Sequence, residues 1–302
     1  MAEIVVVGST NTDMVVKSAY LPKPGETLLG GEFFMNPGGK GANQAVAAAK
    51  LGGKVTFITK IGSDVFGEAS LANFKKVGIN TEHIFVDDNA PSGVALINVD
   101  EQAENAIVVA PGANANLLVE DIDRASAAIK SADIVLLQLE IPLETVEHTG
   151  KLAKQLGKRV VLNPAPATLL PDELLKGLFA ITPNETETEF LTGIKITDET
   201  SMIKAGNALL ERGVQHVIIT LGSGGAFYLT TTEKMHVPGY KVRAVDTTAA
   251  GDTFNGALAV QLAQGLTFKE AIDFANKAAA LSVTRLGAQA SCPSAQEVAD
   301  GF

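Results

Sequence analysis

Short apolar runs alternate with amphipathic, helix-like segments along most of this 302-residue chain. The apolar runs are rich in Val, Ile and Leu and read as strands. They cover residues 3–7, 54–59, 133–139, 159–162, 180–182 and 216–221. Because such runs carry few polar positions, both faces of the sheet are expected to be covered. The pattern predicts an α/β fold with a mostly parallel sheet covered by helices on both faces.

Helical periodicity follows nearly every predicted strand. The helices are expected at residues 41–51, 67–77, 118–130, 143–156, 184–192, 201–212, 251–264 and 268–284. The chain shows no internal repeat, low-complexity tract or long polar linker. A single α/β domain spanning residues 1–302 is therefore expected.

Two stretches interrupt the alternation of strands and helices. Residues 13–35 contain Pro22-Lys-Pro-Gly25, and residues 92–110 read as two short strands, 94–99 and 105–109, around a polar turn. Each stretch predicts an antiparallel β-hairpin, and together they predict a small β-sheet lid over the main domain. Exposed sheet edges or faces favour pairing with a second subunit, so a homodimer through the lid is expected.

Composition narrows the function classes. Hydrophobic residues make up 46% of the chain and charged residues 19%, which supports a sizeable core. There is no apolar stretch of membrane-spanning length, and the N-terminal residues read as a strand without a basic flank or cleavage site. We expect a soluble cytoplasmic protein. The net charge of −10 disfavours nucleic acid or an anionic membrane as the main partner, and the single Cys292 excludes an internal disulfide.

The segment Asp246-Thr-Thr-Ala-Ala-Gly-Asp252 directly precedes a helix-like run at residues 253–264. Its small residues leave successive backbone N–H groups uncovered at a helix start, where an anion of phosphate size fits. A carboxylate beside such an anion suits phosphoryl transfer, because it can accept the proton of an attacking hydroxyl. Alternatively, Asp252 only caps the helix. This segment alone leaves both interpretations open.

Polar residues follow several of the predicted strands. In open α/β sheets, ligands bind beyond the carboxyl ends of the strands. Taken singly, each of these residues could be a helix cap or a turn former, but their shared position predicts a binding site. They are Asn11 and Asp13 after the first strand, then Glu140, Asn163, Asn184 and Glu187.

Two further glycine-rich segments allow a ligand to approach the backbone closely. Gly38-Gly-Lys-Gly-Ala-Asn43 opens a helix but lacks the spacing of a Walker A motif, and the dinucleotide fingerprint is also missing from the chain. A P-loop enzyme and a Rossmann dehydrogenase are therefore disfavoured. Thr220-Leu-Gly-Ser-Gly-Gly225 suits contact with a nucleotide, or forms a plain hairpin turn before strands at 226–229 and 234–237.

Taken together, these segments resemble the ribokinase-like (PfkB) family of carbohydrate kinases from end to end. The motifs that carry the resemblance are Asn11-Thr-Asp13, Gly38 to Gln44, Gln138-Leu-Glu140, Asn163-Pro-Ala-Pro166, Thr182 to Glu187, Thr220 to Gly225 and Asp246 to Asp252. The resemblance implies a parallel α/β core with a small β lid. It also implies transfer of the γ-phosphoryl group of ATP to the 5-hydroxyl of D-ribose, giving D-ribose 5-phosphate and ADP.

The resemblance further implies roles for individual residues. Asp252 matches the catalytic base, and Ala249, Ala250 and Gly251 match the anion hole that receives charge developing on the γ-phosphate. The positions expected to contact the sugar are Asn11, Thr12, Asp13, Gly39, Lys40, Gly41, Ala42, Asn43, Glu140 and Asp252.

ATP and two cations are implied in the same way. The positions expected to contact ATP are Asn184, Thr220, Leu221, Gly222, Ser223, Gly224, Gly225, Gly251, Asp252 and Asn276. Asn184 and Glu187 match an N-x-x-E element associated with Mg²⁺, which Glu187 would contact directly or through water. Potassium is expected near Asp246, Thr248, Ser282, Arg285, Gly287 and Ser291, largely through backbone carbonyls.

Other functions remain open at this point. A related kinase for deoxyribose, fructose, a nucleoside or a pyrimidine would use the same core, because few pocket residues set specificity. A non-catalytic sugar or nucleotide sensor is a second class, although it need not keep Asp252, Lys40 and Gly251. A purely structural assembly protein would leave the polar strand ends unexplained.

Overall fold

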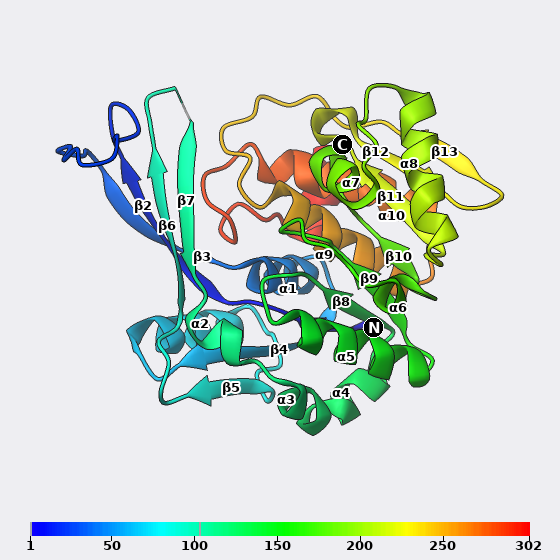
Figure 1. Ribbon diagram of the computed structural model, residues 1–302, viewed down its shortest axis with the longest axis horizontal. Helices are drawn as coiled ribbons and strands as arrows, with labels where there is room; N and C mark the ends of the chain where they lie inside the picture. The colour runs from blue at the N-terminus through cyan, green and yellow to red at the C-terminus, as the bar shows by residue number, and fades with distance from the viewer. Residues whose placement is uncertain (1, 103) are drawn as a thin grey trace.

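The computed structural model describes residues 2–102 and 104–302, which form one large and one small β-sheet (Figure 1). Neighbouring strands of the large sheet run parallel from β5 to β11, whereas β12 is antiparallel to both β11 and β13. In spatial order the strands are β13 (Lys234–Val237), β12 (Ala226–Leu229), β11 (His216–Thr220), β10 (Ala180–Ile181), β9 (Arg159–Leu162), β8 (Ile134–Leu137), β1 (Glu3–Val7), β4 (Lys54–Gly62) and β5 (Ile84–Asp87).

Helices cover both faces of the large sheet, as the sequence predicts. Alternate residues of β1 show this arrangement, because Ile4 and Val6 pack in one core and Val5 and Val7 in another. The first core also contains residues of α1 (Lys40–Lys50), α2 (Val65–Lys76), α9 (Ala250–Ala263), α10 (Phe268–Ser282) and α11 (Ala295–Gly301). The second contains residues of α3 (Val119–Arg124), α4 (Ser126–Ser131), α5 (Leu143–Gln155), α6 (Asp172–Leu175) and α8 (Glu199–Glu211).

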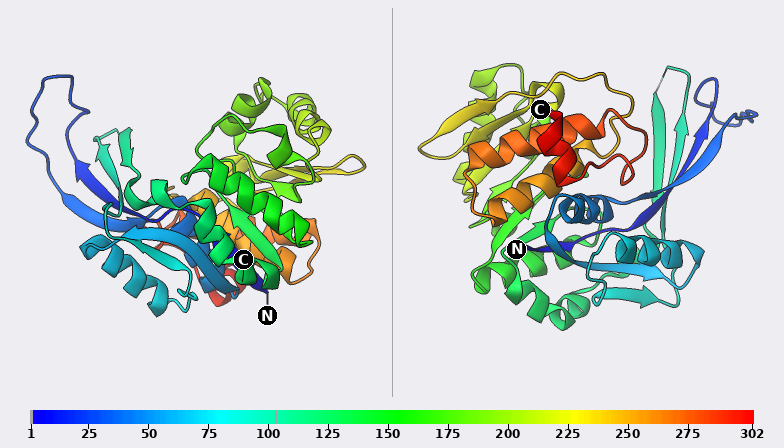
Figure 2. Two further views of the ribbon diagram at one scale, coloured as in Figure 1. Left: turned by 60° about the horizontal axis from the view of Figure 1, so that its bottom comes forward. Right: turned by 180° about the vertical axis from the view of Figure 1, so that it is seen from behind.

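The smaller sheet confirms the two predicted hairpins. It consists of β3 (Phe33–Gly38), β2 (Asn11–Lys17), β6 (Gly93–Val99) and β7 (Asn105–Ala110), in that order. Each hairpin is antiparallel, and a parallel pairing of β2 with β6 joins them. The sheet projects from the core beside α2 (Figures 1 and 2). Its first hairpin runs from Asn11 to Gly38, beyond the predicted range of 13–35, and residue 103 of the second lies outside the described residues.

Four details of the sequence-based prediction were wrong or missing. The single helix expected at residues 118–130 is two short helices, because the chain tightens at Ala125, whose N–H is shared between the carbonyls of Asp121 and Ile122. Strand β5 was not predicted, since its four residues are only partly buried. The short helices α6 and α11 were also missed. None of these elements carries a predicted site residue.

The strand order changes direction at β1, which lies between β4 and β8. In doubly wound α/β sheets, ligands bind beyond the carboxyl ends of the strands at such a switch point. Ser9 follows β1, and Glu140 follows β8. The fold therefore predicts a ligand site at the loops that meet there.

In the described part of the chain, no helix is long and apolar enough to cross a membrane.

Candidate active site

Two helices, α1 and α9, begin next to each other at the switch point. Glycine at the N-cap of α1, Gly39, has φ of 89°, and the N-cap of α9 is Ala249 with φ of 58°. Ala249 is the one non-glycine residue with positive φ among residues 2–102 and 104–302. Such a conformation is costly for a residue with a side chain and often marks a functional site. Both helix starts are thus built on unusual backbone turns.

Close packing of α9 on α1 fixes the position of Asp252. A Cβ atom on Gly256 of α9 would lie 2.7 Å from Ala47 Cβ and 2.8 Å from the backbone nitrogen of Ala48, so only glycine fits there. This contact brings the first turn of α9 to the second turn of α1. Asn43 and Gln44 of α1 consequently lie beside Asp252.

The side chain of Asp252 does not cap its own helix. Its Oδ2 accepts a hydrogen bond from Asn43 Nδ2 at 3.0 Å, and its Oδ1 accepts one from Gln44 Nε2 at 2.9 Å. The residue is 7% exposed. The alternative that Asp252 is simply a helix cap is therefore wrong, because Ala249 occupies the N-cap position and the carboxylate is directed to the other helix.

Around the start of α9, the predicted anion hole has open space. Gly251 is exposed, and an added Cβ would meet no atom within 4 Å. The Ala250 N–H donates to the carbonyl of Thr247 at 3.3 Å. The following N–H groups, those of Gly251 and Asp252, belong to the first turn, which a helix leaves without internal acceptors. These groups can donate to an anion.

Glu140 joins the loop after β8 to the start of α1. Its Oε2 accepts hydrogen bonds from Ser9 Oγ at 2.6 Å and from the backbone N–H of Lys40 at 3.0 Å. Gly41 and Ala42 are buried against the end of β1, and the N–H of Ala42 donates to the Ser9 carbonyl at 2.8 Å. The structure thus gives Glu140, Gly41 and Ala42 structural contacts at positions expected to contact the sugar.

One lysine lies among four carboxylates in this region. Burial lowers the pKa of Lys40, but the carboxylates of Asp252, Glu140, Glu187 and Asp13 outweigh that effect and raise it. Burial, with the negative charges of Glu140 and Asp252, raises the pKa of Asp13 to about 6 despite the opposing charge of Lys40. The side chains of Lys40, Asp13, Glu140, Asp252 and Glu187 therefore lie close enough for their charges to affect one another.

Asn11 is fixed by a residue that sequence reasoning missed. Its Oδ1 accepts a hydrogen bond from Asn114 Nδ2 at 2.8 Å, and Asn114 also bonds the backbone N–H and carbonyl of Thr10. Asn114 lies in the 3₁₀ helix η1 (Gly112–Asn116), which follows the last lid strand. Thr12, the residue after Asn11, is half-buried in β2 and pairs with Pro37 of β3 and Val94 of β6.

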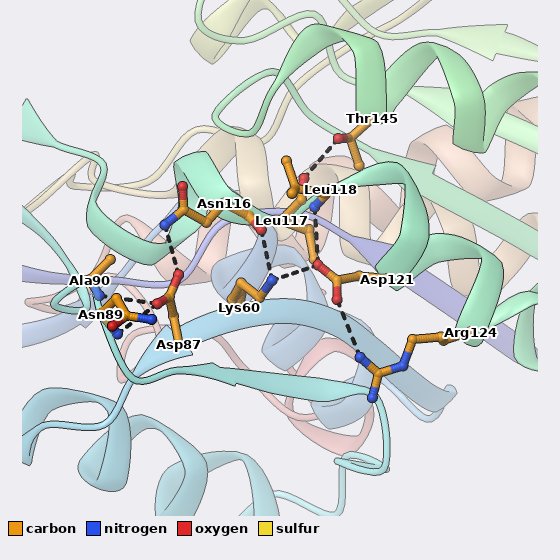
Figure 3. Close-up of polar contacts among 10 residues, drawn as sticks. All are labelled: Lys60, Asp87, Asn89, Ala90, Asn116, Leu117, Leu118, Asp121, Arg124 and Thr145. Atoms are coloured by element: carbon orange, nitrogen blue, oxygen red, sulfur yellow. Dashed lines mark hydrogen bonds and ion pairs between the residues drawn. The ribbon is translucent and has the colours of Figure 1, made fainter.

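A buried ion pair anchors η1 to the core, as Figure 3 shows. Lys60 Nζ of β4 donates to the carbonyl of Asn116 at 2.8 Å and to Asp121 Oδ2 of α3 at 2.7 Å. Thr145 of α5 donates to the next carbonyl, that of Leu117, at 2.7 Å. The segment that holds Asn11 at the base of the lid is therefore bonded to β4, α3 and α5 of the main domain.

The predicted magnesium element is also a helix cap. Asn184 is the N-cap of α7 (Glu185–Thr192), and its side chain accepts from the Glu187 N–H at 2.8 Å. Glu187 Oε2 accepts from the Asn184 N–H at 2.9 Å, completing a capping box. Burial raises the pKa of Glu187, although the Asn184 hydrogen bond and Lys40 oppose the shift. The two residues thus hold the start of the helix, and Glu187 also lies close enough to Lys40 and Asp252 for their charges to affect its pKa.

A cavity of about 520 Å³ lies at the start of α9, where Ala250 and Gly251 form part of its lining. Among the residues predicted to contact ATP, it is lined by Thr220, Gly222, Ser223, Gly225, Gly251 and Asn276. Asn184, Leu221, Gly224 and Asp252 are outside its lining. The loop from Thr220 to Gly225 is both a hairpin connection between β11 and β12 and a wall of the cavity, so the two interpretations of this segment are compatible.

The side chain of Asn276 is oriented by the chain after β13. Its Nδ2 donates to the carbonyls of Val237 at 3.1 Å and Pro238 at 3.2 Å, which leaves the amide oxygen able to accept from a ligand. Apolar residues missed by the sequence analysis complete the cavity: Val242, Ala244, Phe254, Ala279, Ala280 and Val283. Such a polar and apolar lining suits a flat heterocycle. A second cavity of about 480 Å³, beside α5, contains none of the predicted site residues.

Asp246 brings together the two loops expected to hold potassium. Its Oδ1 accepts from the Thr248 N–H, and its Oδ2 accepts from the Gly287 N–H, both at 2.9 Å. Burial alone would raise the pKa of Asp246, but its hydrogen bonds to Thr248 and Gly287 lower it. Ser282 and Ser291, which flank the Gly287 loop in the sequence, are buried. The Arg285 side chain forms an ion pair with Glu297 of α11 at 2.6 Å, so Arg285 can offer a cation only its backbone carbonyl.

Within residues 2–102 and 104–302, no group of three or more His, Cys, Asp or Glu residues is arranged to hold a metal ion. Any resident cation would therefore depend on backbone carbonyls, hydroxyls, water or ligand oxygens. The loops around Asp246 are compatible with that type of site, because the Asp246 carboxylate holds them together by accepting the backbone N–H groups of Thr248 and Gly287.

Comparisons with known proteins agree with this geometry. Residues 1–295 match the description pfkB family carbohydrate kinase. A ribokinase of Haemophilus influenzae is 48% identical over 294 residues, covering 97% of this chain and 96% of the relative. A deoxyribokinase of Salmonella typhi is 41% identical over 297 residues, covering 98% and 97%.

Solved structures give the same result for the fold. Arabidopsis thaliana ribokinase, complexed with ribose and ATP, superposes with a TM-score of 0.94 at 34% identity, covering 99% of this chain and 98% of that chain. The family match spans nearly all of the sequence, and the superposition covers both the parallel core and the β lid. The chain therefore belongs to the pfkB family of carbohydrate kinases.

Proposed function

We propose that this carbohydrate kinase transfers the γ-phosphoryl group of ATP to the 5-hydroxyl of D-ribose, with Asp252 as the catalytic base. The observation that carries the proposal is the position of Asp252. Its buried carboxylate contacts Asn43 of α1, one of the residues expected to contact the sugar, and the two residues before it, Ala250 and Gly251, line the 520 Å³ cavity of the predicted nucleotide site. The products would be D-ribose 5-phosphate and ADP.

In this mechanism, Asp252 accepts the proton of the 5-hydroxyl as that oxygen attacks the γ-phosphorus. The transition state of phosphoryl transfer carries negative charge on its equatorial oxygens. The backbone N–H groups from Ala249 to Gly251, at the positive end of α9, would donate to those oxygens, with the Ala250 N–H exchanging its 3.3 Å hydrogen bond to the Thr247 carbonyl for the phosphoryl group. Lys40 would supply the nearby positive charge. Alignment and electrostatic stabilisation would then provide most of the rate enhancement.

The polar residues at the lid base and the start of α1 support a sugar with several hydroxyl groups. Asn11, Asp13, Lys40 and Asn43 offer an amide, a carboxylate, an ammonium and a second amide, while Gly39, where a Cβ would lie 2.7 Å from the Asn11 nitrogen, lets the start of α1 pack closely against Asn11. These groups can pair with hydroxyls as donors and acceptors. A sugar lacking one hydroxyl would leave a partner unpaired, which is the physical basis of discrimination. The ribose named in the Arabidopsis complex supports ribose as the first substrate to test.

Magnesium is part of the proposal because the site carries an excess of negative charge. Lys40 is one cation among the carboxylates of Asp13, Glu140, Glu187 and Asp252. A nucleotide polyphosphate would be repelled by this set unless it arrived with a divalent cation. We propose that Mg²⁺ binds with ATP and keeps several waters, and that Glu187 acts through one of them.

We also propose that potassium binds between the Asp246 loop and the Gly287 loop. The convergence of these loops supports the proposal. The ion would stabilise the turn that positions Ala249 and Ala250, without contacting the sugar. Because carbonyl ligands leave no side-chain signature, this site must be tested by measurement. Stimulation of turnover by K⁺ but not by Na⁺ would support it.

We infer that the chain acts as one α/β domain, residues 1–302, with a lid formed by insertions near 13–35 and 92–110.

The lid also supports a homodimer. One of its rungs places Met35, Met14, Leu96 and Val108 side by side on one face. Asp13 lies on the opposite face, so this rung faces away from the site. Met35 and Leu96 are each 53% exposed and Val108 is 68% exposed.

Since the proposed co-substrate of this enzyme is ATP, we propose that the enzyme is cytoplasmic.

A related substrate is favoured by one specific observation, the 41% identity to a deoxyribokinase. The test of the proposed function is ADP release with MgATP and ribose, 2-deoxyribose, fructose or adenosine, each with K⁺ or Na⁺. The highest kcat/KM with ribose supports the proposal. A preference for 2-deoxyribose would retain Asp252 as base but replace the substrate. ADP release that no acceptor stimulates would favour a sensor and overturn the proposed function.

A further inference from the structure

Two chains of amide side chains end on the two oxygens of Asp252. In the first, Gln138 donates to Gln44 Oε1 at 2.6 Å, and Gln44 Nε2 donates to both Asp252 Oδ1 and Asn163 Oδ1 at 2.9 Å. In the second, Asn73 donates to Gln289 at 2.8 Å, Gln289 donates to Asn43 at 3.2 Å, and Asn43 donates to Asp252 Oδ2. Of these amides, the sequence analysis placed Asn43 and Asn163 in the expected site, and it gave no role to the others.

The direction of the first chain is fixed by its surroundings. Asn163 Nδ2 donates to the Thr182 carbonyl at 3.3 Å, and a carbonyl can only accept. The other end of the Asn163 amide is therefore its oxygen, which needs a donor. Asp252, as a carboxylate, also needs a donor. Because Asn163 Oδ1 and Asp252 both need a donor, the Gln44 amino group must face them. Gln44 Oε1 therefore faces Gln138 and accepts a hydrogen bond from its amino group.

An excess acceptor appears at the far end of the same chain. Gln138 Oε1 is the one fully enclosed side-chain polar atom without a hydrogen-bond partner among residues 2–102 and 104–302. Gln138 cannot turn this oxygen toward Gln44, because two acceptors would then meet. Gly8 closes the space around it, since an added Cβ there would be 2.1 Å away. Unpaired buried acceptors are rare and reduce stability. Gln44 Nε2 thus donates to Asp252, and the consequence is that Gln138 Oε1 stays without a hydrogen-bond partner.

We propose that Gln44 is a positioning residue that fixes the orientation of the Asp252 carboxylate for the attacking hydroxyl. This inference rests on the proposed function, in which Asp252 is the base. Gln44 is 0% exposed, so it can contact neither sugar nor nucleotide and must act through Asp252. Asn43 is 8% exposed and is expected to contact the sugar as well. Gln44 is therefore the residue that isolates the positioning effect.

The first test is Gln44→Met, which keeps the side-chain length and removes the donor. A small misplacement of a reacting group can cost about 10²-fold in rate. We expect kcat to fall roughly 10- to 100-fold, with the KM values for sugar and ATP within twofold of wild type. The matched control is Gln261→Met. Gln261 is also buried, at 8% exposure, and lies on α9 about 14 Å along the helix from Asp252. The control should retain wild-type kcat.

A double-mutant cycle separates positioning from general damage to the fold. In the Asp252→Asn background the base is gone, so Gln44→Met should change the residual kcat less than twofold. A loss as large as that in the wild-type background would mean that Gln44 acts on the structure and not through Asp252. This outcome would overturn the inference.

Gln44→Met leaves Gln138 and Asn163 with unpaired groups and can impair folding. The second variant is therefore Gln44→Met with Gln138→Met, which removes both partners of the 2.6 Å hydrogen bond and the unpaired Gln138 oxygen. Removing both partners costs less stability than removing one. We expect the same loss of kcat in this variant, with thermal unfolding closer to wild type than in Gln44→Met alone.

The outcomes are distinguishable. A folded Gln44→Met protein, or the folded double variant, with kcat within twofold of wild type would overturn the inference and leave the proposed function intact. Near wild-type turnover by Asp252→Asn alone, or no sugar-dependent turnover by the wild type, would overturn both. A selective fall in kcat that disappears in the Asp252→Asn background supports both.

Discussion

Asn184 and Glu187 bond each other reciprocally at the start of α7, each side chain accepting the backbone N–H of the other residue. The element expected to serve magnesium is therefore also a structural cap. A substitution that removes the Glu187 side chain affects both roles at once. Substitutions that separate charge from hydrogen bonding are needed to assign either role.

Glu187→Gln separates the two roles, because Gln also completes a capping box. We expect the melting temperature to stay within about 2 °C of wild type, while the Mg²⁺ concentration for half-maximal turnover rises roughly tenfold. Glu187→Ala is the matched control and should also lose roughly 0.3–1.5 kcal/mol of stability. Unchanged magnesium dependence in Glu187→Gln would limit this residue to the cap.

Asp13 gives the site a pH dependence of known sign. Because its pKa is raised to about 6, Asp13 is charged above that pH and takes up a proton below it. A protonated carboxyl accepts sugar hydroxyls less well than a carboxylate. We expect kcat/KM for the sugar to fall as the pH drops below about 6, since this ratio reports groups of the free enzyme.

The control for this pH dependence is Asp13→Asn. It should bind the sugar more weakly at neutral pH, and its kcat/KM should no longer change around pH 6. An acid limb that persists unchanged in Asp13→Asn would assign the titration to a different group.

Two glycines of α9 predict opposite effects on stability. Gly251→Ala adds a Cβ into open space, so stability should rise by roughly 0.5–1 kcal/mol as for alanine in a helix. Its turnover should fall roughly 10²-fold, because the methyl group enters the space proposed for the γ-phosphate.

Gly256→Ala has no such space and presses on the backbone of α1. Overpacking of this kind costs about 1–3 kcal/mol, and displacement of α9 should also lower kcat. Thermal unfolding and kinetics of both variants provide the check. A Gly251→Ala protein that is stable and fully active would exclude the proposed anion hole.

The lid face predicts the oligomeric state. A lysine at Leu96 would have to be desolvated in each copy of the proposed dimer. We expect Leu96→Lys to change the mass measured by light scattering from two chains to one. Leu169→Lys, at a 77% exposed position outside the lid, is the control and should not change it. A monomeric wild type would contradict the dimer.

Much of the fold and several site residues were predictable from sequence because their signals are local. Strands β1 and β9 have the predicted bounds, since continuous Val and Ile runs define them. Asp252 was identified because small residues precede it in a helix start. Burial of Asp252 and its contact with α1 depend on packing over a separation of more than 200 residues, which periodicity does not encode.

The hydrogen bonds among the buried amides were not predictable for the same reason. Gln44 and Gln289 have the appearance of ordinary polar residues, and only the folded chain shows that both connect to Asp252. Asn114 was missed because it lies in a turn after the lid, where asparagine is common. The signal that could have identified Gln44 was its place directly after Asn43, within the glycine-rich motif.

The most direct test of the account is sugar-dependent ADP release by Asp252→Asn compared with wild type. General base catalysis contributes roughly 10²- to 10⁴-fold. We predict a kcat reduced by at least about 10²-fold in a folded variant that still binds ribose. Turnover near the wild-type rate would contradict the assignment of Asp252 as the base and, with it, the proposed mechanism.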